Sequence, residues 1–131
     1  MRRYLLDTNH AGELLKKNPR MRTRVRPDSG LELGVARPTV GELWYMVLNS
    51  ARIRENQLGL DELLGEMKIW ELDDPACFEF GTIRVELRKR GTPLPQIDVQ
   101  IAAIARVNDL TVLSADRHFN MVQGLRVENW L

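Results

Sequence analysis

The chain of 131 residues has the length of one domain, and 44% hydrophobic with 28% charged residues is typical of a globular rather than a disordered protein. Its 19 basic and 18 acidic residues leave a formal net charge of +1, which excludes nucleic-acid binding through overall charge and leaves only local patches. One cysteine excludes an internal disulfide, two histidines offer no zinc spacing, and no apolar run fits a membrane span or signal peptide, so we expect one cytoplasmic domain over residues 1–131 with no membrane partner.

The first part of the chain predicts two strands, each followed by a helix. Residues 4–6 form a short apolar strand, and apolar residues at helical spacing predict a helix over 8–17, closed by Asn18-Pro19. An arginine-studded segment follows and is predicted as a helix that stops at the turn residues 27–30. Residues 31–37 are a weaker strand candidate, and Pro38-Thr39 opens a helix that runs to about residue 51.

The second part predicts further helices separated by strands. Leucine spacing predicts a helix over 58–66, residues 68–72 are a short strand candidate, and Asp74-Pro75 begins a helix to about residue 90. A strongly apolar stripe predicts a helix over 95–108, before a buried strand at 110–113 and a last strand at 126–129. Strands separated by helices favour an α/β fold, a three-layer α/β/α sandwich with a mainly parallel central sheet.

Acidic residues stand where the predicted strands meet helices. Asp7 follows the first strand, Glu42 lies early in the helix after the second, Asp116 follows the strand at 110–113, and Asp98 begins the most apolar helix. Parallel sheets bind ligands at the carboxyl ends of their strands, so we expect these acids along one rim. Clustered carboxylates repel one another unless a cation lies between them, and oxygen ligands without His or Cys suit Mg²⁺ or Mn²⁺. A water oriented by such an ion and a carboxylate is a nucleophile for phosphodiester hydrolysis.

Each acid also has a structural interpretation. Asp7 has the position of a helix cap that accepts a hydrogen bond from the backbone N–H of residue 9 or 10. Asp98 in the first turns of a helix gains from the helix dipole. Thr39 and Glu42 have the spacing of a capping box, in which Thr39 caps the helix and Glu42 reaches back to the Thr39 N–H.

Four short motifs occur in one order and spacing along essentially the whole chain. They are residues 5–9 (LLDTN), Glu42-Leu43 after Thr39, Asp98 followed by IAAIA, and residues 113–119 (LSADRHF). Together they resemble the PIN-domain ribonucleases and, within them, the VapC-type toxins of type II toxin–antitoxin pairs. The resemblance implies a metal-dependent endoribonuclease with a compact α/β/α fold, whose acids map to Asp7, Glu42, Asp98 and Asp116.

The resemblance also assigns supporting residues. Thr8 and Asn9 would support the site through their hydroxyl and amide groups, and Ser114 stands where the family often has Thr. The sequence departs from the family at Ser114-Ala115, because many relatives have a Thr-Arg pair before the position of Asp116. The ligands of the metal would be Asp7, Asp98 and Asp116.

Partners follow from the same resemblance. It implies homodimers, an RNA substrate, and a small antitoxin that wraps the toxin and often pushes a basic side chain into the acidic pocket. Trp44, Tyr45 and Trp70 could give apolar surface to a partner or belong to the core. Two basic sets could meet RNA phosphates, or could be a solvated face and a cation-rich helix end: Arg20, Arg22, Arg24 and Arg26, and Arg84, Arg88, Lys89 and Arg90.

Two other functions remain as alternatives. A phosphoacceptor signalling domain also carries acids at strand ends, but it would need a lysine after a late strand, and no lysine follows Lys89. A PIN-like binding module without catalysis would be expected to lack one or more of the four acids, which are all present. His10 and His118 lie near the acids in the sequence, but no nucleophile pairs with either, so we expect both to be peripheral.

Overall fold

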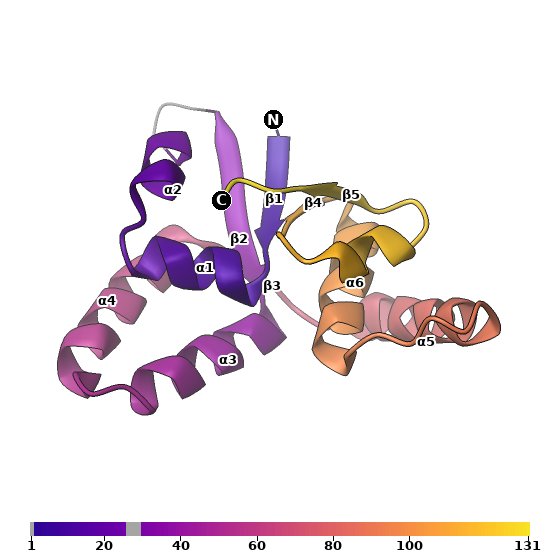
Figure 1. The fold of residues 1–131 in the computed structure, drawn as a ribbon, viewed down its shortest axis with the longest axis horizontal. Coiled ribbons are helices and arrows are strands. Elements are labelled where there is room, and N and C mark those ends of the chain that lie inside the picture. Colours follow the sequence, from indigo (N-terminus) through magenta and orange to yellow (C-terminus); the bar gives the residue numbers. More distant parts are fainter. Residues whose placement is uncertain (1, 26–29) are drawn as a thin grey trace.

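The computed structural model describes residues 2–25 and 30–131, and strands and helices alternate along it (Figure 1). Arg26 and the predicted turn residues 27–29 lie outside the described residues. In chain order the elements are β1 (Arg2–Leu6), α1 (Thr8–Leu15), α2 (Pro19–Arg24), β2 (Leu31–Ala36), α3 (Arg37–Leu48), α4 (Ile53–Glu66), β3 (Lys68–Trp70), α5 (Asp74–Lys89), α6 (Gln96–Asn108), β4 (Thr111–Leu113), the 3₁₀ helix η1 (Arg117–Met121) and β5 (Arg126–Glu128).

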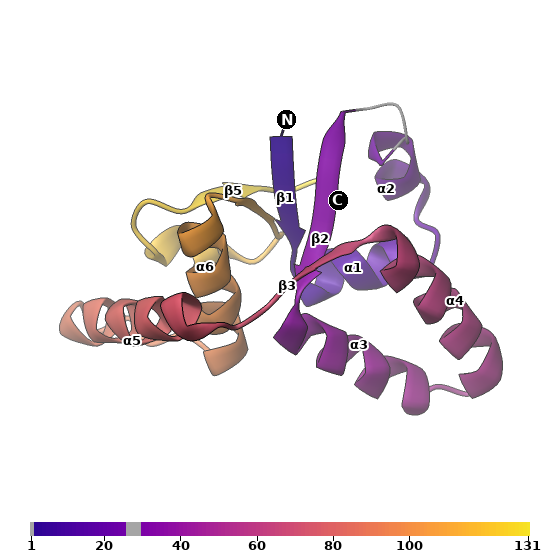
Figure 2. The ribbon, with the colours of Figure 1, turned by 180° about the vertical axis from the view of Figure 1, so that it is seen from behind.

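The strands of the described residues form one five-stranded sheet in the order β3-β2-β1-β4-β5, and every neighbouring pair is parallel. Helices α1 to α4 lie on one side of this sheet and α5 and α6 lie on the other, as both views show (Figures 1 and 2). The expected three-layer α/β/α sandwich with a parallel central sheet is therefore confirmed.

The central strand β1 contributes to both hydrophobic cores because successive side chains of a strand point to opposite faces. Tyr4 and Leu6 pack into the core beneath α1 to α4, and Leu5 packs into the core beneath α5 and α6. All three side chains are buried. Residues of β1 thus join the two helical layers, and the sheet has no face open to water at its centre.

The order of the strands places a topological switch beside β1. The chain leaves β1 toward β2 on one side and returns later to β4 on the other side. At the carboxyl end of this pair, the backbone N–H of Asp7 donates to the carbonyl oxygen of Leu113 at 3.0 Å. In open parallel sheets a crevice forms at such a point, where neighbouring connections diverge to opposite faces.

Two helix boundaries differ by three residues or more from the sequence expectation, and one short helix was not expected. Helix α4 begins at Ile53 rather than at Leu58, and its cap residue Arg52 makes no side-chain capping bond. Helix α3 ends at Leu48 instead of near residue 51, and η1 was not predicted. Within the described part of the chain, no helix combines the length and the apolarity that crossing a membrane requires.

Candidate metal centre

Asp7 occupies the joint between β1 and α1 and caps the helix. Its Oδ1 accepts a hydrogen bond from the backbone N–H of His10 at 2.8 Å, which confirms the capping interpretation. The residue is nevertheless only 6% exposed, which is unusual for a cap whose sole task is to end a helix in water. The cap therefore also holds a largely buried carboxylate at the carboxyl ends of β1 and β4.

Asp116 follows β4 at the same edge and caps η1. Its Oδ1 accepts from the backbone N–H of His118 at 2.9 Å, and its own N–H donates to the Oγ of Ser114 at 2.9 Å. Ser114 is buried, and its N–H donates to the carbonyl oxygen of Glu128 at 2.9 Å. Ser114 thus lies in a turn that fixes the Asp116 carboxylate relative to β4.

Asp98 lies in the first turn of α6, whose apolar stripe packs into the core against the sheet. Burial raises the pKa of the Asp98 carboxyl, a hydrogen bond with His118 lowers it, and the charges of Asp116 and Asp7 raise it again. Asp116 and Asp7, from two other parts of the fold, are thus near enough for their charges to act on Asp98. Among the described residues, Asp98 and Asp116 belong to one compact group of possible metal ligands and Asp7 does not, so the ligand set of three acids stays a prediction.

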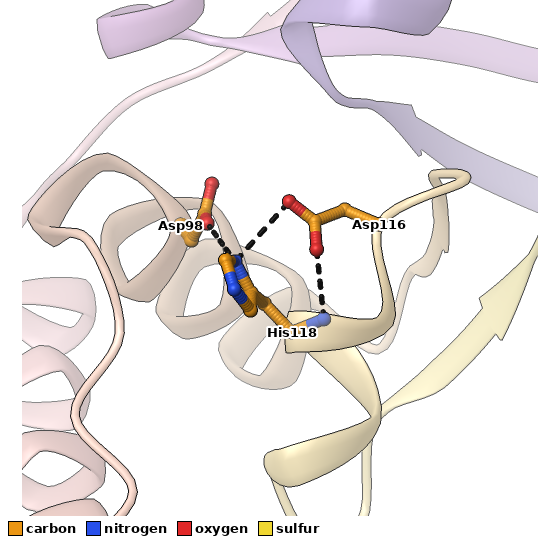
Figure 3. A group of neighbouring side chains, drawn as sticks. All are labelled: Asp98, Asp116 and His118. Atoms are coloured by element: carbon orange, nitrogen blue, oxygen red, sulfur yellow. Dashed lines mark hydrogen bonds and ion pairs between the residues drawn. The ribbon is translucent and has the colours of Figure 1, made fainter.

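His118 lies between two of these acids, contrary to the expectation that it is peripheral. Its Nδ1 is 3.3 Å from Asp98 Oδ2 and 3.2 Å from Asp116 Oδ2. Figure 3 shows the two carboxylates approaching the imidazole ring from different sides. Ligand atoms of Asp98, Asp116 and His118 all lie within 4.8 Å of one another, close enough to surround a single ion.

His10 is also in contact with the site rather than peripheral. Its ring is fully buried, and its Nε2 accepts a hydrogen bond from the backbone N–H of Trp130 at 3.1 Å. A neutral ring that accepts through Nε2 carries its proton on Nδ1. That Nδ1 lies 3.3 Å from Asp7 Oδ1, although it makes no well-directed hydrogen bond among the described residues. His10 therefore packs the last residues of the chain against the Asp7 carboxylate.

Glu42 is exposed on α3. It makes no ion pair or side-chain hydrogen bond with any described residue, and like Asp7 it is not part of the group around His118. The capping-box interpretation is wrong, because α3 begins at Arg37, its cap is Ala36, and no side chain caps it. Thr39 lies inside the helix, where its buried hydroxyl has no hydrogen-bond partner in the described part of the chain.

The remaining predicted residues have varied places. Thr8 is half-buried and Asn9 is exposed, and neither side chain forms a hydrogen bond within residues 2–25 and 30–131. Of the three aromatic residues considered for a partner surface, Trp70 is buried, Trp44 packs against the core beneath α1 to α4, and Tyr45 is largely exposed at 66%. In the basic sets, the Arg24 guanidinium stacks over Trp130 at 4.3 Å and that of Arg84 lies 5.7 Å from the Phe80 ring.

A divalent cation fits this donor set. The carboxylates of Asp98 and Asp116 belong to one compact group with His118, and the pKa of Asp98 is raised both by burial and by the charges of Asp116 and Asp7. A cation relieves this repulsion, and carboxylate oxygens suit Mg²⁺, Ca²⁺ or Mn²⁺. The chemistry that such an arrangement supports is hydrolysis of a phosphodiester, with a metal acting on the phosphate and a water.

Comparison with known proteins agrees with this chemistry. The family model described as PIN domain matches residues 4–125. The ribonuclease VapC2 of Haemophilus influenzae is 32% identical over 133 residues, which cover 100% of both chains. The tRNA(fMet)-specific endonuclease VapC of Salmonella typhimurium is 28% identical, over 99% of each chain.

Solved structures show the same similarity. The DNA-bound VapBC of Salmonella typhimurium contains a chain with a TM-score of 0.92 and 28% identity, and the match covers 100% of both chains. VapBC2 of Rickettsia felis, bound to a promoter DNA fragment, gives 0.91 and 25% identity over 98% of this chain and 99% of the other. The fold and the similarity to ribonucleases over the full chain define a nuclease domain. The chain belongs to the PIN domain family.

Proposed function

We propose that the protein is an endoribonuclease, the toxin of a toxin–antitoxin pair, and that it hydrolyses RNA with a bound Mg²⁺ or Mn²⁺. The proposal is supported chiefly by one combination: the chain matches ribonuclease relatives over its full length, and the charges of Asp116 and Asp7 act on the partly buried carboxyl of Asp98. A binding module without catalysis would have no need to gather like charges at an energetic cost.

In this proposal Asp98, Asp116 and Asp7 hold the ion, and the fold holds each carboxylate in place by a different device. The α1 cap fixes Asp7, the η1 cap and Ser114 fix Asp116, and the first turn of α6 fixes Asp98. The ion, when bound, would supply Lewis acidity toward the phosphodiester and a water. The partial burial of Asp98 strengthens electrostatic interactions at its carboxylate.

Incubation with total RNA tests the proposed function. We expect cleavage in the presence of Mn²⁺ or Mg²⁺ and none in excess chelator, because three carboxylates that repel one another need a cation to act together on a phosphodiester. Re-addition of Mn²⁺ to the chelated sample should restore cleavage, which separates metal dependence from inactivation. Undiminished cleavage in chelator would overturn the metal part of the proposal, and RNA left intact under all conditions would overturn the nuclease.

Glu42 is proposed as a catalytic residue of the same site on the family resemblance alone. Its carboxylate is exposed on α3 and caps nothing, so Glu42→Gln should leave the free energy of unfolding within about 0.5 kcal/mol of the parent. If Glu42 acts on RNA or its metal, cleavage of RNA should fall on the order of tenfold or more, because an amide is a weaker ligand and no base. Initial rates with Mn²⁺, beside a thermal melt, measure both; a fully active variant would remove Glu42 from the site.

The partner in this proposal is a small antitoxin, because several similar structures are complexes of toxin with antitoxin. A homodimer is the second proposed assembly. Exposed apolar side chains that could serve a protein partner include Tyr45 and Leu48 on α3 and Phe78 on α5. Phe78 is 80% exposed, which is rare for a large aromatic residue that faces only water.

A further inference from the structure

His118 is placed as if to serve the acidic site through one ring nitrogen. The same Nδ1 atom lies 3.3 Å from Asp98 on α6 and 3.2 Å from Asp116 before η1, so two elements present a carboxylate to it (Figure 3). A surface histidine that merely ends a turn would need no contact with either. The ring nitrogen therefore lies beside two of the carboxylates that are proposed to hold the ion.

The turn that carries His118 is fixed at several points. The His118 N–H donates to Asp116 Oδ1, and the Asp116 N–H donates to Ser114 Oγ. The next residue, Phe119, is buried and packs into the core beneath α5 and α6. About half of the His118 side chain, 49%, stays accessible to solvent, so the ring is positioned by the turn and still open to an ion.

We infer that His118 Nδ1 is a ligand of the metal and makes the site bind Mn²⁺ in preference to Mg²⁺, an inference that depends on the proposed metal-dependent function. Adjacent ligand atoms of an octahedral ion with bonds of about 2.1 Å are separated by about 3.0 Å. The two nitrogen–oxygen separations, 3.2 and 3.3 Å, are close to this value. Imidazole nitrogen suits transition metals, whereas Mg²⁺ is bound mainly by oxygen.

The same distances from His118 Nδ1 to the two carboxylates would be found if His118 had a different role. The ring could only donate a hydrogen bond to the acids and stay away from the ion. In that case its nitrogen would make no bond to a bound metal, and replacing it would change the affinities for Mg²⁺ and Mn²⁺ alike. The relative affinity for the two ions and the presence of a metal–nitrogen bond therefore separate the two roles.

Electron paramagnetic resonance of Mn²⁺ bound to the full chain tests the inference directly. Pulsed measurements at about pH 8, where ligands are more readily deprotonated, should detect a histidine nitrogen coupled to the ion in the unsubstituted protein. His10 is not a source of this signal, because its Nε2 accepts from the Trp130 N–H and its Nδ1 consequently carries the proton. Absence of nitrogen coupling in protein that binds Mn²⁺ would overturn the inference.

Binding titrations with a variant pair supply the second test. His118→Gln should weaken Mn²⁺ binding by about tenfold, change Mg²⁺ binding by less than about threefold, and abolish the nitrogen coupling. Arg117→Gln, on the same exposed turn, is the control for the local loss of a basic side chain. It should leave the affinities for Mn²⁺ and Mg²⁺ unchanged. An unchanged Mn²⁺ to Mg²⁺ ratio in His118→Gln would overturn the inference while the metal site itself stands.

Asp98→Asn separates failure of the inference from failure of the proposed function. If it binds neither ion while His118→Gln behaves as the parent, the acids hold the metal and His118 does not. If the unsubstituted protein binds neither Mn²⁺ nor Mg²⁺, the proposed metal dependence fails and the inference fails with it. Thermal melts of every variant in chelator establish that each measurement concerns folded protein.

Discussion

Asp98→Asn is expected to lower RNA cleavage by a factor on the order of 10³ while leaving the protein folded, because several kcal/mol of electrostatic stabilisation depend on the ion that this carboxylate holds. Asn keeps the size of the side chain and the start of α6, so no cavity forms. Initial rates on total RNA with Mn²⁺, measured beside thermal melts, give both quantities. Asp61→Asn, at an exposed position of α4, is the matched control and should be fully active.

The same substitution has an effect on stability whose sign follows from the pKa of Asp98. Burial raises this pKa in the folded state, so the folded protein binds the proton more tightly than the unfolded chain does. Stability of the metal-free protein therefore falls as pH rises from the ordinary pKa of aspartate to the raised value. The Asp98→Asn variant has no carboxyl to ionise at this position, so it does not lose stability in this way. Its melting temperature in chelator at neutral pH should therefore be higher than that of the parent. A variant that melts lower there, or that still cleaves RNA, would contradict the assignment.

Asp7→Asn is expected to change how stability responds to metal. Asn caps a helix about as well as Asp, so the bond to the His10 N–H is retained. Removal of one of three neighbouring negative charges should raise the melting temperature in chelator, by about 2–5 °C for roughly 1 kcal/mol. Added Mn²⁺ should stabilise the parent by about 2.7 kcal/mol at a hundredfold excess over its Kd, and the variant much less. The two melting curves should cross during a Mn²⁺ titration, and the variant should cleave no RNA.

Asp73→Asn is the matched control for this experiment. Asp73 caps α5 as Asp7 caps α1, with its Oδ1 accepting from the Ala76 N–H at 3.1 Å, but it is exposed and outside the acidic crevice. Its variant should follow the parent at every Mn²⁺ concentration. If Asp7→Asn also runs parallel to the parent, with an equal gain from metal, then Asp7 is a cap and nothing more.

The sheet and three of its acids were predictable because both follow from short-range patterns. Short apolar segments that alternate with segments of helical periodicity predict a parallel sheet. Parallel strands then bring Asp7 and Asp116 to the same edge of that sheet. The start of α4 was missed because residues 53–57 are mostly polar and Arg52 offers no capping side chain. The capping box predicted at Thr39 was wrong because Pro38 is compatible with the first turn of a helix. Helix α3 therefore starts at Arg37, and Thr39 lies within the helix with its side chain buried in the core.

The roles of the two histidines were not predictable in the same way. His118 contacts Asp116 across a 3₁₀ turn that the hydrophobic periodicity of the sequence does not predict. It contacts Asp98 only because η1 packs against α6. One local pattern could have indicated the first contact: an acid that caps a short helix accepts from the N–H two residues later. The contact between His10 and Trp130 joins residues 120 positions apart, and only tertiary structure reveals it.

The central strand β1 is translated before both of its neighbours in the sheet. Asp7 is translated more than a hundred residues before Asp116, and Asp98 also comes late. A growing chain therefore carries Asp7 long before it can assemble the crevice, and sheets built from distant segments close slowly. Cleavage of RNA near the ribosome that makes the protein would have to await synthesis of Asp98 and Asp116, which leaves an interval in which an antitoxin already present can meet a harmless intermediate.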